Sequence, residues 1–208
     1  MTLKEEILEL KRKCYECQEC PLGRKLVDGL DPHVFASGYI KAKLIFVAEA
    51  GGADEVKLKR PLVGRAGQFF DGKILGVAGI DRSKVFISNS VLCRPSGNRT
   101  PLPAEIELCR PHLDAQICLL EPELLITMGN VALQSCCEER GITKKRGILR
   151  WSRKWSNDKR VPVFPIYHPA YCLRGSGLGE MKQDAEKIGE FYRRIQSGAG
   201  IIVEEYYV

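Results

Sequence analysis

The 208-residue sequence lacks an apolar run long enough to cross a membrane. Its longest apolar runs, such as LIFVA at 44–48, fall far short of the roughly 20 residues that a transmembrane helix needs. The stretch MTLKEEILELKRK at the N-terminus interleaves acids and bases along a helical pattern, without the apolar core and cleavage site of a signal peptide. We therefore expect a protein of the cytoplasm that makes no contact with a membrane.

Internal repeats and low-complexity segments are also missing from the sequence. A hydrophobic content of 44% is ample for a complete core, and a charged content of 28% is ordinary for a soluble protein. We expect one domain over residues 1–198, followed by a tail, AGIIVEEYYV, over 199–208. The tail sequence fits either an extra edge strand or a loose end.

A large excess of one charge sign is lacking as well. The 32 basic and 26 acidic residues give a formal charge of +6, which favours an anionic partner only weakly. Cysteine, in contrast, is plentiful, with nine residues. Disulfides are rare in reducing compartments, and an odd number of thiols cannot form a fully paired framework. Metal ligation is therefore the more specific interpretation for some of these cysteines.

Apolar segments and helical patterns alternate along the chain. Four segments are typical of strands: 43–50, 85–92, 122–130 and 161–168. Helical patterns follow them, at 64–79, 103–120, 131–140 and 179–198. This alternation predicts an α/β fold with three α/β/α layers and a four-stranded, mostly parallel central sheet. Ligands of such folds bind beyond the carboxyl ends of the strands, so we expect the functional residues in the loops there.

Three cysteines occur at two-residue intervals in CYECQEC, as Cys14, Cys17 and Cys20. A Cys-x-x-Cys turn lets two sulfurs face one metal group, and Cys93 and Cys109 are the natural candidates to complete a set of four. Spacing alone is compatible equally with zinc and with an iron–sulfur cluster. The other four cysteines lack such spacing and are interpreted as packing thiols: Cys118, Cys136, Cys137 and Cys172.

Several motifs occur in the order typical of one enzyme family. They are CQECPLGR (17–24), RPLVGRAGQFFD (60–71), SNSVLCRPSGNRTPLPAEIELC (88–109), KKRG (144–147) and YHPAYCLR (167–174). In these motifs the chain resembles the family 4 uracil-DNA glycosylases, the iron–sulfur enzymes of bacteria and archaea, over roughly residues 14–195. The resemblance implies a uracil-DNA glycosylase-like fold. It also implies base excision repair, in which uracil is flipped out of DNA and its N-glycosidic bond is hydrolysed to leave an abasic site.

The resemblance also implies a cofactor. In the family, a cysteine pair that precedes Pro-Leu joins two later cysteines around a [4Fe-4S] cluster. The positions that match this pattern are Cys17, Cys20, Cys93 and Cys109, which leaves Cys14 as a spare thiol. The family's cluster is a structural clamp away from the base pocket. We therefore expect it to hold the N-terminal segment 1–24 against the sheet.

Four polar residues match the family's catalytic positions. Asn89 offers an amide donor and an acceptor, which suit the O4 and N3–H edge of uracil and disfavour cytosine. His168, held by the following proline, can donate a hydrogen bond to uracil O2 as negative charge develops. Glu49 matches the glutamate of the first motif and could orient water or stabilise the sugar cation. Glu55 aligns with a second acid in the same loop.

The residues expected to line the base pocket depart from the family pattern. The expected lining, apart from Asn89 and His168, is Ala50, Gly51, Gly52 and Leu62. Gly51 replaces a proline, and Leu62 replaces a phenylalanine that stacks on the extruded uracil. Stacking on an aromatic ring is worth roughly 1–3 kcal/mol per base, so weaker uracil binding or a different base range follows. Phe69 or Phe70 could compensate for the missing aromatic.

Basic and apolar residues on the same loops are expected to meet DNA, in single or double strands. Leu173 matches the family's wedge, which fills the gap left by the flipped base. The cations expected at phosphates are Arg65, Arg99, Lys145, Arg146 and Arg174. We expect the protein to act as a monomer. The sequence does not specify a strand preference or a partner such as a sliding clamp.

Other functions remain open at this stage. A DNA-binding relative could retain the fold and the cluster and have lost most catalysis, or act on other deaminated bases. The joint presence of Glu49, Asn89 and His168 favours a working uracil glycosylase over that alternative. An iron–sulfur redox protein unrelated to DNA would leave these base-pocket residues and the basic loops without a purpose.

Overall fold

The computed structural model describes residues 1–203, and a six-stranded sheet forms their centre. The strand order is β1-β3-β2-β4-β6-β5, in which β3, β2, β4 and β6 are parallel to one another. The strands are β1 (Ser37–Gly38), β2 (Leu44–Ala50), β3 (Phe86–Val91), β4 (Leu124–Met128), β5 (Arg150–Trp151) and β6 (Pro162–Ile166). The predicted α/β class and the four parallel strands are confirmed. The two antiparallel edge strands were not predicted, because two residues are too few to show a period.

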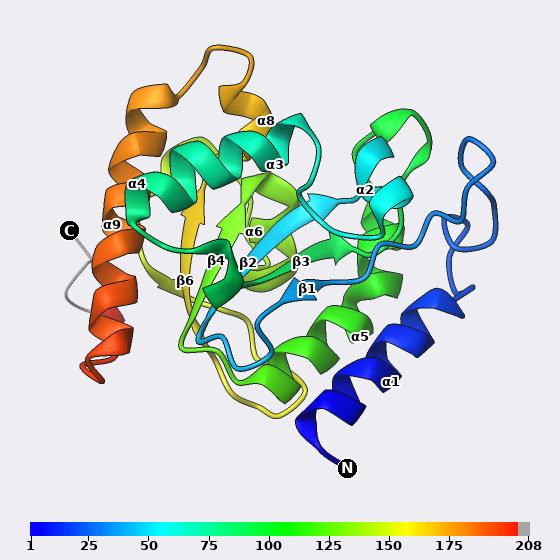
Figure 1. Cartoon of the computed structure of the whole chain (residues 1–208), viewed down its shortest axis with the longest axis horizontal. Helices are drawn as coiled ribbons and strands as arrows, with labels where there is room; N and C mark the ends of the chain where they lie inside the picture. Colours follow the sequence, from blue (N-terminus) through cyan, green and yellow to red (C-terminus); the bar gives the residue numbers. More distant parts are fainter. Residues whose placement is uncertain (204–208) are drawn as a thin grey trace.

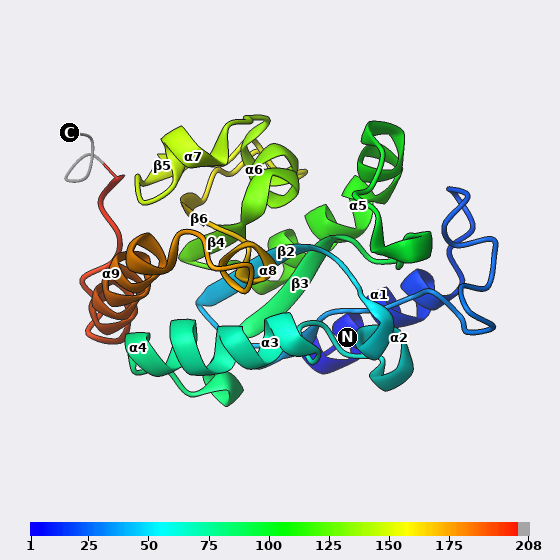
Figure 2. The same cartoon turned by 90° about the horizontal axis from the view of Figure 1, so that it is seen from above.

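Helices cover both faces of the sheet (Figures 1 and 2). On one face, α5 (Pro103–Leu120) lies beside α1 (Leu3–Tyr15) and α6 (Gly129–Cys137). On the other face, α9 (Leu178–Gln196) packs against a continuous helical segment. That segment runs through α3 (Arg65–Phe69), the π-helical turn η1 (Phe70–Leu75) and α4 (Gly76–Ala78). The short helices are α2 (Ala53–Leu58), η2 (Arg82–Lys84), η3 (Ser96–Asn98), α7 (Ile142–Lys145) and α8 (Pro169–Cys172).

The central strands are apolar because both of their faces are buried. In β2, Leu44, Phe46 and Ala48 enter the core under α9, while Ile45 and Val47 enter the core under α5. Side chains of a strand alternate between the two faces of a sheet, so a strand that is covered on both sides needs an unbroken apolar run. This requirement explains why LIFVA was recognisable as a strand in the sequence.

The segment between α1 and β2 crosses the chain that follows β3. His33 forms an antiparallel bridge with Cys93. The Val34 amide donates to the Leu92 carbonyl at 2.7 Å, and the Arg94 amide donates to the Pro32 carbonyl at 2.9 Å. These bonds bring the N-terminal cysteines and the cysteines that follow β3 to the same end of the molecule.

The beginning of the tail packs against α9 and is not a strand. The Ala199 amide donates to the Arg194 carbonyl at 3.0 Å, and Val203 is buried in the core under α9. Neither of the two expectations for the tail therefore applies to residues 199–203, and the rest of it lies outside the described residues. No helix within residues 1–203 combines the length and the apolar character that a bilayer span requires.

Candidate functional site

The carboxyl ends of the parallel strands bring polar residues together, as the fold class predicts. We call this group the strand-end site, formed by Glu49, Asn89, Gly129 and His168. Asn89 is paired in register with Ala48, which directly precedes Glu49. Gly129 and His168 follow the neighbouring strands β4 and β6, and a Cβ atom built on Gly129 would lie 3.2 Å from the Cβ of His168. Residues far apart in the sequence thus meet at one edge of the sheet.

His168 is held as a neutral imidazole with its donor nitrogen free. Its Nδ1 accepts a hydrogen bond from the Ala170 amide at 3.2 Å, where His168 caps the N-terminus of α8. The proton of the neutral ring therefore resides on Nε2. Burial, and to a lesser degree the charge of Arg174, lowers the pKa of His168 to about 4. At neutral pH this side chain is a hydrogen-bond donor without a charge.

Gly129 was not singled out by the sequence analysis, although it lies close to the side chain of His168. Its φ of +88° is a left-handed conformation that favours glycine. A side chain at this position would also press against the His168 side chain. The only signal in the sequence was a glycine near the end of the strand predicted over 122–130.

Glu49 is a half-buried carboxyl group at the end of β2. Burial raises its pKa above the ordinary range of glutamate, and hydrogen bonding from the Thr100 side chain opposes that shift. Thr100 belongs to the loop between Cys93 and Cys109, so this loop reaches the strand-end site. Thr100 also escaped the sequence analysis, because nothing in its local pattern links it to Glu49.

Asn89 has a buried side chain whose amide has no hydrogen-bond partner within the described residues. It is 2% exposed and lies in the middle of β3. Both neighbouring hydroxyls are satisfied, since Ser88 donates to Gln116 at 2.7 Å and Ser90 donates to the Ala48 carbonyl at 2.9 Å. The donor and the acceptor of the Asn89 amide are therefore both available to a ligand.

Glu55, expected to be catalytic, makes structural contacts in this fold. Its carboxylate accepts hydrogen bonds from the amides of Gly52 at 3.0 Å, Val63 at 2.9 Å and Gly64 at 2.8 Å. These three bonds close the loop 52–64 around α2. Glu55 therefore holds this loop in place, and its direct role in catalysis stays a prediction.

The rest of the expected pocket lining follows β2 and α2. Ala50 is half-buried at the end of β2, and Gly51 is buried against Val34, where a Cβ atom would lie 2.8 Å from a Val34 methyl. The Gly52 amide is already bonded to Glu55. The structure thus explains Gly51 by the close approach of Val34.

Leu62 lies on the same side of the sheet as Asn89. It is 6% exposed and belongs to the core that also holds Ala48, a register partner of Asn89. Its φ of +51° is uncommon for a branched side chain. Phe70 is completely buried with its ring edge-on to Phe46 at 4.8 Å between centroids, so it cannot stack on a base. Phe69 is partly buried against the same core.

Three of the cations expected at DNA are bound to acidic residues. Arg99 donates to both carboxylate oxygens of Glu105, at 2.8 and 2.7 Å. Arg146 does the same with the buried Asp184, at 2.9 and 2.6 Å, and Lys145 forms an ion pair with Glu139. These pairs were invisible in the sequence because their partners are brought in by the tertiary fold. They weaken the expectation that these residues bind phosphate.

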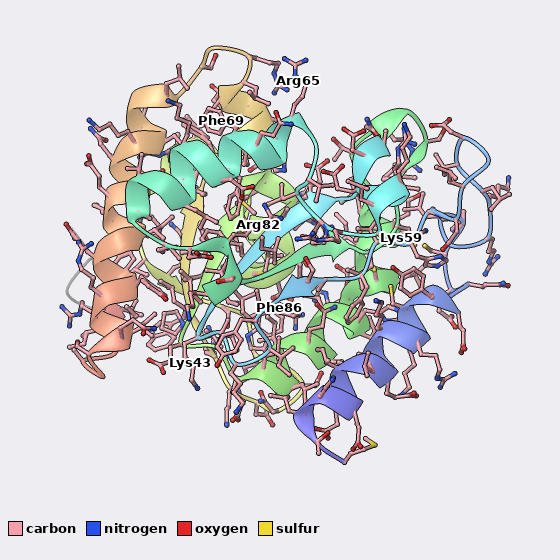
Figure 3. All side chains as sticks on the ribbon, in the orientation of Figure 1. Lys43, Lys59, Arg65, Phe69, Arg82 and Phe86 are labelled. Carbon is pink, nitrogen blue, oxygen red and sulfur yellow. The ribbon has the colours of Figure 1, made fainter. Side chains whose placement is uncertain are left out.

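The other expected DNA contacts lie exposed beside His168. Leu173 and Tyr171 are each 39% exposed at the end of α8, and the Arg174 guanidinium lies 5.9 Å from the centre of the Tyr171 ring. Arg65 begins α3, which packs against α8, and Figure 3 shows its side chain reaching outward at the edge of the molecule near α8. We call these four residues the exposed edge, which lies beside the strand-end site: Leu173, Tyr171, Arg174 and Arg65.

A second pocket contains five thiols. We call it the cysteine pocket, lined by Cys14, Cys17, Cys20, Cys93 and Cys109 together with His33 and His112. Burial, and then the neighbouring thiols, raises the pKa of Cys14 and Cys93 well above the usual range, and burial raises the pKa of Cys109 to about 12. The Leu92 amide donates to the Cys109 sulfur at 3.3 Å. Thiols in such a setting become thiolates only when a cationic group compensates the charge.

The five thiols of the cysteine pocket are a donor set of the kind that the cluster implied by the resemblance would need. Within residues 1–203, no three His, Cys, Asp or Glu side chains converge on one point as ligands of a single metal ion do. The thiols nevertheless share one mostly apolar pocket. Thiols spread around a common space suit a multi-atom cluster, whose ligands stand further apart than the four around one zinc ion.

Comparisons with known proteins point to one family. The uracil DNA glycosylase superfamily matches residues 35–193 of the chain. The chain is 35% identical over 193 residues to the Type-4 uracil-DNA glycosylase of Sulfurisphaera tokodaii, an alignment that covers 89% of this chain and 84% of that protein. It is 34% identical over 201 residues to the Type-4 uracil-DNA glycosylase of Thermotoga maritima, covering 93% and 99% of the two chains.

Proposed function

The chain belongs to the uracil DNA glycosylase superfamily, and from this membership we propose that it removes uracil from DNA by hydrolysing the N-glycosidic bond. The observation that carries the proposal is Asn89, a residue that is 2% exposed and whose side-chain amide has no hydrogen-bond partner within residues 1–203, at the same end of the sheet as the neutral donor His168. A flipped uracil offers polar groups that complement both side chains. Two oriented polar groups at the end of a parallel sheet form a binding site for such a base.

Asn89 accounts for the choice of base. Its amide nitrogen can donate to uracil O4, and its amide oxygen can accept from N3–H. Cytosine carries an amino group in place of O4 and an acceptor in place of N3–H, so the same amide would meet a donor with a donor and an acceptor with an acceptor. A site built to form such bonds rejects the mismatched base strongly, because its buried polar groups would remain unpaired.

His168 accounts for the stability of the leaving group. When the C1′–N1 bond breaks, uracil departs with the bonding electron pair as an anion whose charge spreads onto O2. A neutral imidazole that donates from Nε2 stabilises this charge with a preorganised hydrogen bond and keeps its own proton. Because the pKa of His168 is about 4, the ring stays in this form throughout the neutral range. Gly129 maintains the position of the ring.

Glu49 is the residue proposed to act on the sugar side of the reaction. Its carboxylate can orient the water that adds to C1′ and can stabilise the cationic sugar. The proton lost by that water passes to Glu49 or to solvent, which balances the negative charge on uracil. Ala50, Gly51, Gly52 and Leu62 would line the space between the sugar and the base.

The exposed edge beside His168 is proposed to hold the DNA. Leu173 would enter the base stack in place of the flipped nucleotide, and Arg65 and Arg174 would contact phosphates on either side. Arg99, Lys145 and Arg146 stabilise the fold through their acidic partners in our revised assignment. We propose that the protein acts on DNA as a monomer in the cytoplasm.

The cysteine pocket is proposed to hold a [4Fe-4S] cluster through Cys17, Cys20, Cys93 and Cys109. A bound cluster supplies a covalent cross-link between the N-terminal segment and the elements β3 and α5. Cys14 is buried in the same pocket and would pack beside the cluster as a fifth thiol. The Leu92 amide would donate to the sulfur of Cys109, which stabilises its negative charge.

A cleavage assay tests the proposed function. The iron-loaded protein is incubated with a labelled oligonucleotide that contains one uracil, and abasic sites are detected by alkaline cleavage. We expect excision by the wild type and a loss of about 10²–10³-fold in the single-turnover rate of His168→Ala, since one donor to the developing anion is removed. Matched oligonucleotides with cytosine, hypoxanthine or xanthine define the base range. Absence of excision at uracil by the wild type would overturn the proposal.

A further inference from the structure

Residues 31–34 form a connection between the two candidate sites, and we call this segment the strap. On one side, its backbone is bonded to residues 92–94, and the His33 ring lies with Nε2 3.0 Å from the Cys17 carbonyl oxygen. The strap therefore lies between the N-terminal cysteines and Cys93. Within the strap, Nδ1 of His33 is 2.5 Å from a carboxylate oxygen of Asp31.

On its other side, the strap is bonded to the side chain of Lys59. The Lys59 ammonium donates to the Asp31 carbonyl at 2.6 Å, to the Asp31 carboxylate at 2.9 Å and to the His33 carbonyl at 3.2 Å. An ammonium group has three donors, so all of them are used on one short segment. Figure 3 shows Lys59 below α2, where the chain approaches the strap.

The backbone of Lys59 is as unusual as its side chain. Lys59 ends α2 with a φ of +52°, a left-handed conformation that glycine adopts without steric cost and lysine adopts rarely. A residue that is held in such a conformation needs support from its surroundings. The three bonds to the strap supply that support, and they fix the point from which the loop 59–64 departs.

The loop 59–64 in turn carries groups of the base pocket. Leu62 packs on the sheet face of Asn89, and the amides of Val63 and Gly64 are bonded to Glu55. The strap contacts the pocket at a second point, where Val34 packs against Gly51. The loop 51–64 therefore contacts the strap at two points, Gly51 and Lys59. We call the cysteine pocket and the strap together the cysteine lobe.

We propose that Lys59 is a positioning residue for uracil excision, which acts by tying the base-pocket loop to the strap. The inference rests on the proposed function and adds a route by which the cysteine lobe supports catalysis. Loss of the tie lets Leu62 drift from the base face, so the flipped uracil is held less well in front of Asn89 and His168. Leu173 and Arg174 at the end of α8 should be unaffected, because within the described residues no hydrogen bond or ion pair joins them to Lys59 or the strap.

The test compares Lys59→Met with Lys57→Met. Methionine keeps most of the apolar stem and removes the ammonium, and Lys57 is an exposed lysine on the same helix. We expect Lys59→Met to lower the single-turnover excision rate at saturating DNA about tenfold. The DNA concentration at half-saturation and the iron content should change less than about twofold. Lys57→Met should match the wild type in all three quantities.

A double-mutant cycle separates the tie from a general effect on folding. Asp31→Asn removes the charge partner and retains a side chain of the same size, and the Asp31→Asn/Lys59→Met variant should be no slower than Lys59→Met alone. Additive losses would overturn the proposal, and so would a Lys59→Met variant that excises uracil at the wild-type rate.

Hydrogen exchange provides a readout that does not need activity. We expect the Val63 and Gly64 amides to exchange faster in Lys59→Met than in Lys57→Met, because the loop opens more often. Unchanged exchange in this segment would contradict the tie even if the wild type cleaves uracil. Faster exchange in a protein that leaves uracil intact would support the tie and refute the proposed function, so the two failures are distinguishable.

Discussion

The strand-end site and the cysteine pocket differ in what each still needs from outside the chain. At the strand-end site, the polar groups are few and oriented, and Asn89 and His168 each keep bonding capacity for a ligand. In the cysteine pocket, burial disfavours the charged form of several thiols at once. In our proposal, the first site receives a substrate for each reaction, whereas the second holds a resident group that compensates the charge of its thiolates.

This difference shows that polar groups without a partner in the fold can indicate two things, a transient ligand or a permanently bound group. A side-chain amide with no partner in the fold, such as that of Asn89, points to transient binding, because its donor and acceptor stay available to a ligand. Several buried thiols that raise one another's pKa point to a permanent resident, because their cost is large and shared. Three experiments can break or sharpen the comparison, and we order them by the size of the expected effect.

The largest effect is expected from removing a ligand of the proposed cluster. Cys109→Ser should lose most of its bound iron, its brown absorbance and several degrees of Tm, because the N-terminal segment is no longer cross-linked to α5. Cys14→Ser is the matched control from the same pocket and should keep its iron. Iron analysis and thermal denaturation of both variants provide the measurement. Full iron content in Cys109→Ser would remove the distinction between the two sites.

A smaller effect is expected from pH at the strand-end site. Burial raises the pKa of Glu49, and catalysis needs its carboxylate form, so the excision rate should fall as pH decreases through a value above the ordinary pKa of glutamate. His168, with a pKa of about 4, should add no step near neutral pH. The single-turnover rate is measured against pH for the wild type and Glu49→Gln. A slow Glu49→Gln variant with the same acid limb would show that another group titrates.

The smallest effect is expected at the exposed edge. Arg65→Gln should weaken DNA binding about two- to fivefold and reduce the slope of log affinity against log salt by about one, as expected for the loss of one phosphate contact. Arg99→Gln should leave that slope unchanged, since its guanidinium is bound to Glu105. Fluorescence anisotropy over a range of salt concentrations measures both. Equal slopes in the two variants would refute the assignment of Arg65 to a phosphate.

Much of the fold could be predicted from the sequence, because each central strand is buried on both faces and therefore needs an unbroken apolar run. The helix predicted at 103–120 has the same bounds in the structure, where proline occupies its first position. The edge strands β1 and β5 escaped because each contains only two residues. The predicted helix 64–79 contains the π-helical turn η1, which the spacing of the apolar residues did not indicate.

The place of a site residue was predictable where its strand fixes it. The role of a residue was not predictable where a hydrogen-bonding partner from elsewhere in the fold determines it. Asn89 lies within β3 and His168 follows β6, two parallel strands of one sheet, so the topology places both toward the carboxyl ends of the strands. Glu55 has the right chemistry for catalysis, yet three amides that arrive from its own loop engage its carboxylate. Arg146 is a basic loop residue like Arg65, and only the fold shows that Asp184 binds it. Tertiary partners leave no local trace in a sequence.

The central place of β2 has a consequence for how the chain is made. β2 pairs with β3 on one edge and β4 on the other, and both partners come later in the chain. During synthesis β2 is therefore exposed before either of its partner strands exists, and unpaired apolar strands of this kind tend to aggregate. Lys41 and Lys43 stand exposed just before the strand, with Lys43 visible at the edge of the molecule in Figure 3, and Glu49 lies near its end. Charged residues that flank an apolar strand oppose such aggregation, and Lys41, Lys43 and Glu49 are charges of this kind on either side of LIFVA.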